Sequence, residues 1–161
     1  MIVVSNTSPI INLAAIGQID LLRRLYSRVI IPQAVYDEII SAGAGQPGVE
    51  EVRSAEWIET RRATDRIVIA ALQTELDDGE AEAIALAIEL NADLLLLDER
   101  KARRIASQLG LRFIGILGAL VEAKHQGIIS AARPVVDDLI TRAGFWISRD
   151  LYERLLRAVE E

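Results

Sequence analysis

Asp98 offers the clearest chemistry in this sequence, because it directly follows the uninterrupted apolar run Leu94-Leu95-Leu96-Leu97. An apolar run that stops on an acid is typical of a buried parallel strand that delivers a carboxylate to a site. The chain opens in a similar way, since Ile2-Val3-Val4-Ser5 runs into the polar Asn6. In open α/β sheets, ligands bind beyond the carboxyl ends of the strands. Two strand ends that offer oxygen atoms suggest a metal ion.

The composition narrows the kind of metal. The chain has no cysteine and a single histidine, His125. Disulfides, thiolate zinc sites, a cysteine nucleophile and a multi-histidine zinc site within one chain are therefore excluded. Mg²⁺ or Mn²⁺ held by oxygen atoms is what remains.

Glu80 is a second candidate ligand, on a predicted helix over residues 80–90. At about 100° per residue, Glu80 lies in the middle of the arc formed by the apolar residues Ala81, Ala83, Ile84, Ala87 and Ile88. We expect Glu80 to face inward, and Glu82 and Glu89 to be solvent-facing charges on the opposite side. An inward charge is costly unless a metal ion or hydrogen bonds compensate it. The alternative is that Glu80 stabilises the start of the helix, which is worth about 0.3–1 kcal/mol.

The helix that Pro32 opens carries two further acids. Asp37 and Glu38 lie about equally far from the centre of its apolar arc, on opposite sides. The arc is formed by Val35, Tyr36, Ile39 and Ile40. Periodicity therefore does not choose between the two acids, and on spacing alone each is a solvated helix charge.

The elements that must position these residues alternate along the chain. With 161 residues, of which 51% are hydrophobic, the chain suits a single domain. Strands are expected at 2–5, 28–31, 57–60, 94–97 and 112–116. Helices are expected at about 9–16, 19–26, 32–40, 48–54, 80–90, 99–109, 117–126, 130–143 and 148–160. This alternation predicts a parallel sheet with helices on both faces, followed by a helical hairpin.

Three local features complete the predicted architecture. Ser8 is expected to cap the first helix, with Pro9 at its first helical position. The glycine-rich segment 43–48 is expected to be a loop. For the apolar segment 65–76, the sequence does not indicate the type of secondary structure.

The charge balance argues against a general nucleic-acid binder, since 24 acidic residues against 18 basic ones give a net charge of −6. Any contact with nucleic acid must therefore be local. The best candidate is Arg100-Lys101-Ala102-Arg103-Arg104, and a weaker one is Arg61-Arg62 with Arg66. The alternative for both is a solvated helix face or turn. No apolar run approaches the ~18 residues of a membrane span, so a soluble cytoplasmic protein is expected.

Four segments together resemble the PIN-domain ribonucleases, and among them the PIN-like proteins related to VapC-type toxins. The segments are 5–13, 31–39, 79–87 and 97–100. The resemblance covers about residues 1–120, and Gly115-Ile116-Leu117-Gly118 with the C-terminal hairpin also looks like this subgroup. It implies a three-layer α/β/α fold with a mostly parallel sheet of four to five strands. Residues 1–161 would form one domain, with an α/β core at 1–120 and helices at 121–161.

The resemblance also implies an activity. PIN domains place three or four acids around one or two Mg²⁺ or Mn²⁺ ions and cleave single-stranded RNA. The family's metal positions fall on Asn6, Glu38, Glu80 and Asp98, of which the three acids would be catalytic. Asn6 departs from the pattern, because an amide oxygen can coordinate a hard cation but carries no charge. A toxin-like role, inhibition by a small antitoxin and homodimerisation are further implications.

Contacts with RNA can be assigned on the same basis. Thr7 and Ser8 could bond a metal-bound water or a phosphate, or serve only as turn and cap. Arg100, Lys101 and Arg104 would contact the RNA backbone, which gives salt-sensitive, sequence-indifferent binding.

Two other functional classes compete with a ribonuclease. A PIN-fold protein without catalysis, acting through RNA or protein binding, is supported by Asn6. A receiver-type signalling domain needs an acidic pair after the first strand and a lysine at the end of a late strand, and Asn6 and Gly115-Ile116 supply neither. Gly43-Ala44-Gly45 is not a phosphate-binding loop, since no lysine-serine pair follows it.

Overall fold

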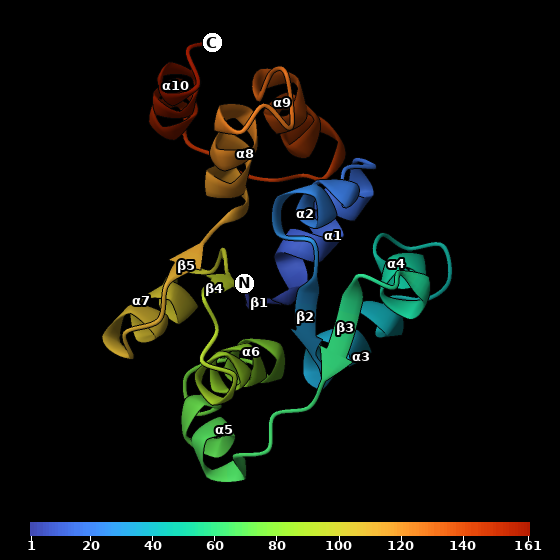
Figure 1. Cartoon of the computed structure of the whole chain (residues 1–161), viewed down its shortest axis with the longest axis vertical. Coiled ribbons are helices and arrows are strands. Elements are labelled where there is room, and N and C mark those ends of the chain that lie inside the picture. The colour runs from blue at the N-terminus through green and yellow to red at the C-terminus, as the bar shows by residue number, and fades with distance from the viewer.

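Five parallel strands run through the centre of the molecule in the order β3-β2-β1-β4-β5 (Figure 1). The computed structural model describes residues 1–161. The strands are Val3–Ser5 (β1), Val29–Pro32 (β2), Ile58–Arg61 (β3), Leu94–Leu96 (β4) and Phe113–Ile114 (β5). Every neighbouring pair is parallel, so the predicted α/β class and parallel sheet are confirmed.

Ten helices connect and cover the strands. They are Thr7–Ala15 (α1), Asp20–Tyr26 (α2), Gln33–Ser41 (α3), Val49–Ser54 (α4), Arg66–Leu72 (α5), Asp78–Glu89 (α6), Arg100–Gln108 (α7), Ile116–His125 (α8), Arg133–Arg142 (α9) and Arg149–Ala158 (α10). The segment 65–76, whose secondary structure the sequence did not indicate, therefore contains a helix. No helix of the structure is both long enough and apolar enough to cross a membrane.

The core lies in two layers, one on each face of the sheet. Alternate residues of a strand point to opposite faces. Val3 and Leu96 accordingly join the cluster packed against α1, α2, α3, α4 and α8, whereas Val4 and Leu95 join the cluster beneath α5, α6 and α7. Because both faces of the sheet are covered, the inner strands β2 and β4 are apolar and buried along their whole length, as the run at residues 94–97 indicated, whereas the edge strand β3 carries polar residues.

The C-terminal helices α9 and α10 lie with α8 at one end of the molecule (Figure 1). The Tyr152 hydroxyl on α10 donates a hydrogen bond of 2.6 Å to Asp137 Oδ1 on α9. Apolar residues of both helices, Val136, Leu139 and Leu155 among them, belong to the larger core cluster. The predicted terminal pair of helices is confirmed, and it packs against the rest of the chain.

The strand order creates a switch point next to β1, because β2 lies on one side of β1 and β4 on the other. Such a point is where open α/β sheets bind ligands. Ser5 pairs with Leu96, and the Asn6 N–H donates a 3.0 Å hydrogen bond to the Leu96 carbonyl oxygen. The residues that follow β1 and β4, including Asn6 and Asp98, therefore leave the sheet at the same edge.

Helix α1 begins earlier than predicted. Its N-cap is Asn6, so Ser8 and Pro9 lie inside the first turn and the prediction of Ser8 as the cap was wrong. The physical reason is that β1 passes into the helix without a turn, and a proline is tolerated in a first turn whose N–H groups make no intrahelical bonds. The Asn6 side chain makes no capping hydrogen bond, which leaves its amide oxygen free for another role.

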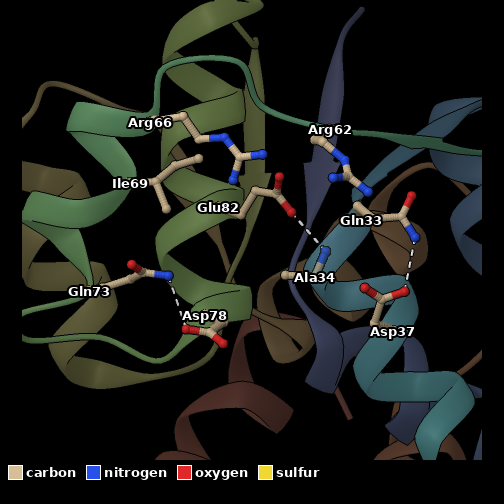
Figure 2. A pocket seen from close by; sticks show the side chains of 9 residues that line it. All are labelled: Gln33, Ala34, Asp37, Arg62, Arg66, Ile69, Gln73, Asp78 and Glu82. Atoms are coloured by element: carbon tan, nitrogen blue, oxygen red, sulfur yellow. Dashed lines mark hydrogen bonds between the residues drawn. The ribbon is translucent and has the colours of Figure 1, made fainter.

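Helix α6 is buried on more sides than its sequence pattern indicated. Glu82 is only 7% exposed, so the prediction that it faces solvent was wrong, and Ile88, expected on the inward arc, is 42% exposed. The Glu82 carboxylate accepts hydrogen bonds from the N–H groups of Ala34 at 2.7 Å and Ala63 at 3.0 Å. Figure 2 shows the first of these bonds. Glu82 therefore ties α6 to the start of α3 and to the segment after β3.

Replacing Glu82 tests this role. Glu82→Ala removes the acceptor of two backbone N–H groups, so we expect a loss of about 2–4 kcal/mol in the free energy of unfolding, measured by urea denaturation. Glu75→Ala, which removes an exposed carboxylate with no hydrogen bond, is the matched control and should change stability by less than about 0.5 kcal/mol. Equal urea midpoints for Glu82→Ala and the wild type would contradict the role assigned to Glu82.

Candidate functional site

A pocket of about 420 Å³ opens at the carboxyl ends of the central strands. Its lining is almost entirely polar, with Ile11 as the one apolar member. The other lining residues are Asn6, Thr7, Ser8, Asn12, Glu38, Asp77, Glu80 and Glu99. We refer to it as the acidic pocket, because four of its residues carry carboxylates. The structure therefore brings three of the four expected metal positions, Asn6, Glu38 and Glu80, to one pocket.

Asn6 supplies an oxygen atom that no group in the protein satisfies. Asn6 is 5% exposed, and its Oδ1 is buried without a hydrogen-bond partner. The hydroxyl oxygen of Ser8 is also buried and has no hydrogen-bond partner. Nearly all buried polar atoms in proteins are hydrogen-bonded, so an orphaned acceptor in a pocket wall points to a ligand.

Gly79 allows the start of α6 to approach this oxygen closely. A Cβ atom at Gly79 would lie 3.0 Å from Glu38 Oε2 and 3.5 Å from both Asn6 Oδ1 and Thr7 Oγ1. Oxygen atoms of Asn6, Thr7 and Glu38, which all lie far from Gly79 in the sequence, therefore surround one point. Any side chain at position 79 would fill the space between them.

Thr7 fixes the direction of Glu38. The Thr7 hydroxyl donates a 2.6 Å hydrogen bond to Glu38 Oε2. Asp37 turns elsewhere, since it accepts a 2.9 Å hydrogen bond from Gln33 and lines the neighbouring pocket of Figure 2. Helical periodicity did not distinguish Asp37 from Glu38. In the structure, Glu38 faces Asn6 in the acidic pocket, and Asp37 does not line that pocket.

Glu80 is half-buried and occupies the third position of α6. It forms a capping box with Asp77, in which the Glu80 N–H donates to Asp77 Oδ1 at 2.8 Å and the Asp77 N–H donates to Glu80 Oε1 at 3.2 Å. Burial raises the pKa of the Glu80 carboxyl, the hydrogen bond from Asp77 opposes this, and the charges of Asp77, Glu99 and Glu38 raise it further. Glu80 therefore takes part in the capping box at the start of α6 and also lines the acidic pocket.

Asp98 leaves β4 with its two oxygen atoms in different environments. Oδ1 accepts a 3.0 Å hydrogen bond from the Ile116 N–H and lies 3.6 Å from Arg103 Nη2. Oδ2 is buried and has no partner. Burial raises the pKa of the Asp98 carboxyl, the Ile116 N–H and Arg103 oppose this, and Glu99 adds to it. Asp98 does not line the acidic pocket.

Asp98 instead lines a second pocket, of about 470 Å³, which we call the arginine pocket. Its other lining residues are Arg100, Arg103, Arg104, Ser107 and Phe113. Two of the residues predicted to bind RNA, Arg100 and Arg104, therefore lie beside Asp98, whereas Lys101 is exposed on the same helix outside the pocket. Glu99 lies between the two sites, since it lines the acidic pocket and its charge reaches Asp98.

The fit to a divalent ion can be judged from the donors. No group of three or more acidic or histidine side chains has the spacing of a metal cluster in this conformation. The available donors are nevertheless oxygen atoms alone, which Mg²⁺ and Mn²⁺ prefer. Two of these oxygen atoms, Asn6 Oδ1 and Asp98 Oδ2, are buried without a hydrogen-bond partner. The residues fit a hard cation because these two atoms could bind it without breaking a hydrogen bond.

Two acids of the acidic pocket, Asp77 and Glu99, were not among the residues predicted from the sequence. Asp77 could have been found, because an acid three residues before Glu80 has the spacing of a capping box. Glu99 directly follows Asp98 as the N-cap of α7, but it makes no capping hydrogen bond there. Its position next to a strand-end acid was the only available indication.

The second predicted basic segment, Arg61-Arg62 with Arg66, does not act as one group in the structure. Arg61 pairs with Glu59 at 2.7 Å. Arg62 and Arg66 line a third pocket, of about 190 Å³, together with Gln33, Asp37, Gln73, Asp78 and Glu82 (Figure 2). Neither Arg62 nor Arg66 has an ion-pair or hydrogen-bond partner in the protein, so both guanidinium groups are available to a ligand.

Comparison with known proteins gives a family and a fold. The family DUF3368, described as a PIN domain, matches residues 2–161. A solved structure of a PilT N-terminus domain protein from the hyperthermophilic archaeon Sulfolobus solfataricus P2 is similar, with a TM-score of 0.61 and 23% sequence identity. The match covers 76% of this chain and 93% of that protein, and at this identity it supports the fold alone. No curated protein matches the sequence.

Proposed function

This chain belongs to the PIN-domain family, whose members are generally nucleases, and we propose that it is a metal-dependent endoribonuclease that cleaves single-stranded RNA. The observation that carries the proposal is the unsatisfied buried oxygen Asn6 Oδ1 in the same pocket as the carboxylates of Glu38 and Glu80. A second unsatisfied buried oxygen, Asp98 Oδ2, follows the neighbouring strand β4. Keeping acids close together costs stability through mutual repulsion, so such a cluster is favoured when it holds a cation.

Asn6, Glu38, Glu80 and Asp98 would hold the ion, and Glu38, Glu80 and Asp98 would carry the charge. Bound Mg²⁺ or Mn²⁺ supplies an activated water and stabilises the negative charge that develops during phosphodiester hydrolysis. Thr7 holds one oxygen of Glu38 in place, and Asp77 does the same for Glu80 through the capping box. The chain needs no histidine or cysteine nucleophile for this reaction.

Three neighbouring pockets that share lining residues offer a path for the RNA strand. The acidic pocket shares Glu38 and Asp77 with a pocket between α3 and α6, and that pocket shares Asp37 and Asp78 with the pocket of Figure 2. Arg62 and Arg66 therefore lie in the pocket furthest along this series from the acidic pocket. The acidic pocket also contains Glu99, whose neighbours in the sequence, Asp98 and Arg100, line the arginine pocket together with Arg104. We propose that these arginines and Lys101 contact phosphates on either side of the scissile bond.

Purified protein tests the activity directly. With Mn²⁺ or Mg²⁺ it should cleave a labelled single-stranded RNA, EDTA should stop the reaction, and the rate should fall with added salt because phosphate contacts are screened. RNA binding without cleavage in either metal would contradict the proposal. That outcome would favour the second candidate, a PIN-fold protein that only binds RNA or protein, for which the uncharged Asn6 is the supporting observation.

The cellular role is a further part of the proposal. We propose that the protein acts in the cytoplasm as a toxin-like component, inhibited by a small antitoxin protein, and that it forms a homodimer. The resemblance to VapC-type toxins supports these points. Light scattering on the purified chain measures the oligomeric state.

A further inference from the structure

Arg103 makes more contacts within the protein than the other basic residues of the predicted RNA-binding segment. Its Nε donates a 2.7 Å hydrogen bond to the Leu97 carbonyl oxygen, and its Nη2 lies 3.6 Å from Asp98 Oδ1. The guanidinium group also lies over the Phe113 ring, 5.6 Å from its centre. Arg100 and Arg104 make no such contacts and are exposed. Arg103 is therefore directed at the end of β4, not at solvent.

Gly115 makes room for this arrangement. A Cβ atom at Gly115 would lie 1.9 Å from Arg103 Nη2 and 2.6 Å from Asp98 Oδ1, and both distances are far too short for real contacts. The φ angle of Gly115 is −92°, which any residue adopts, so glycine is needed here for space and not for conformation. The guanidinium group occupies the volume that a side chain at position 115 would take.

These contacts determine which oxygen of Asp98 remains available. Oδ1 is engaged by the Ile116 N–H at the start of α8 and by the charge of Arg103. Oδ2 has no partner although it is buried. Since the carboxylate is planar, fixing Oδ1 also fixes the direction of Oδ2.

We infer that Arg103 is a positioning residue of the metal site: by holding Oδ1 of Asp98, it presents Oδ2 alone to the cation. This inference rests on the proposed function, because it assumes that Asp98 is a ligand. Groups that orient a metal ligand through its second atom commonly contribute a factor of about 10–100 to metal affinity. Arg103 thus acts on the metal through Asp98, whereas Arg100 and Arg104 act on the RNA.

Titration of Mn²⁺ alone into the full chain, followed by calorimetry without RNA, tests the inference. Arg103→Ala should weaken Mn²⁺ binding by a factor of about 10 or more. Arg103→Lys should restore part of the affinity, because an ammonium group can reach Asp98 but lacks the fork that also bonds Leu97. Gly115→Ala should also weaken binding, since the added methyl group displaces the guanidinium group and crowds Asp98 Oδ1 itself. Arg112→Ala, which removes a nearby exposed arginine, is the control and should leave the affinity unchanged.

The outcomes separate the inference from the proposed function. If Arg103 only ties β4 to α7, or acts on the site mainly as a repelling positive charge, Arg103→Ala binds Mn²⁺ as tightly as the wild type or more tightly, and the inference is overturned. If the wild-type chain itself binds no Mn²⁺, the proposed function fails first, and the inference falls with it. Weakened binding by folded Arg103→Lys supports the inference even if Arg103→Ala does not fold.

Discussion

Asp98→Asn and Glu80→Gln should each reduce the rate of RNA cleavage on the order of a hundredfold, the usual cost of removing one group that stabilises charge in a transition state. Both substitutions keep the size of the side chain and remove its negative charge. Asp98→Asn also retains Oδ1 as an acceptor for the Ile116 N–H, so the start of α8 should keep its hydrogen bond. Single-turnover cleavage of a labelled single-stranded RNA in Mn²⁺ measures the effect.

Two controls make this result specific to the site. Glu56→Gln removes an exposed carboxylate outside the acidic pocket and should cleave at the wild-type rate. Binding of RNA by the two inactive variants should be no weaker than that of the wild type, because each loses a negative charge near the path of the phosphates. Cleavage at the wild-type rate by both Asp98→Asn and Glu80→Gln would indicate a contaminating nuclease or a different site.

Asn6→Asp should have the opposite effect and tighten Mn²⁺ binding by about 10–100-fold. The substitution adds a negative charge at a ligand position without changing the shape of the side chain. It breaks no hydrogen bond of the side-chain oxygen, because Asn6 Oδ1 has none. Calorimetric titration of Mn²⁺ into the purified variant measures the change.

The same substitution should lower the stability of the metal-free protein. Residue 6 is 5% exposed and lies near Glu38 and Glu80, so a third charge is both buried and repelled. Mn²⁺ should restore this stability by mass action, which a thermal-unfolding series at increasing Mn²⁺ would report. Asn91→Asp adds the same charge at an exposed position remote from the pocket and is the control. An unchanged Mn²⁺ affinity for Asn6→Asp would show that Asn6 does not occupy a ligand position.

The sequence predicted the sheet well because buried parallel strands consist of continuous apolar runs. Residues 2–5 and 94–97 were identified in this way, and the structure pairs them as neighbours. Helix α6 was predicted less well, since its many alanines blur the difference between its faces. Glu82 was misplaced because its partners, the N–H groups of Ala34 and Ala63, come from distant parts of the chain. Helical periodicity contains no information about such partners.

The candidate site was predictable in outline and not in its contacts. Strand ends and the start of a helix identified Asn6, Asp98 and Glu80, but the helix pattern alone did not separate Glu38 from Asp37. The fold separates them through Thr7, which bonds Glu38. The engagement of Asp98 by Arg103 depends on the space at Gly115, which is a property of packing.

We propose that oxygen atoms at the ends of β1 and β4 and on α3 and α6 bind one divalent cation. The decisive experiment is diffraction from crystals soaked in Mn²⁺, recorded for its anomalous signal. We expect a peak at about 2.0–2.3 Å from Asn6 Oδ1 and from carboxylate oxygens of Glu38, Glu80 or Asp98. A saturating soak that leaves this edge of the sheet without a peak, or places Mn²⁺ only at remote surface carboxylates, would contradict it.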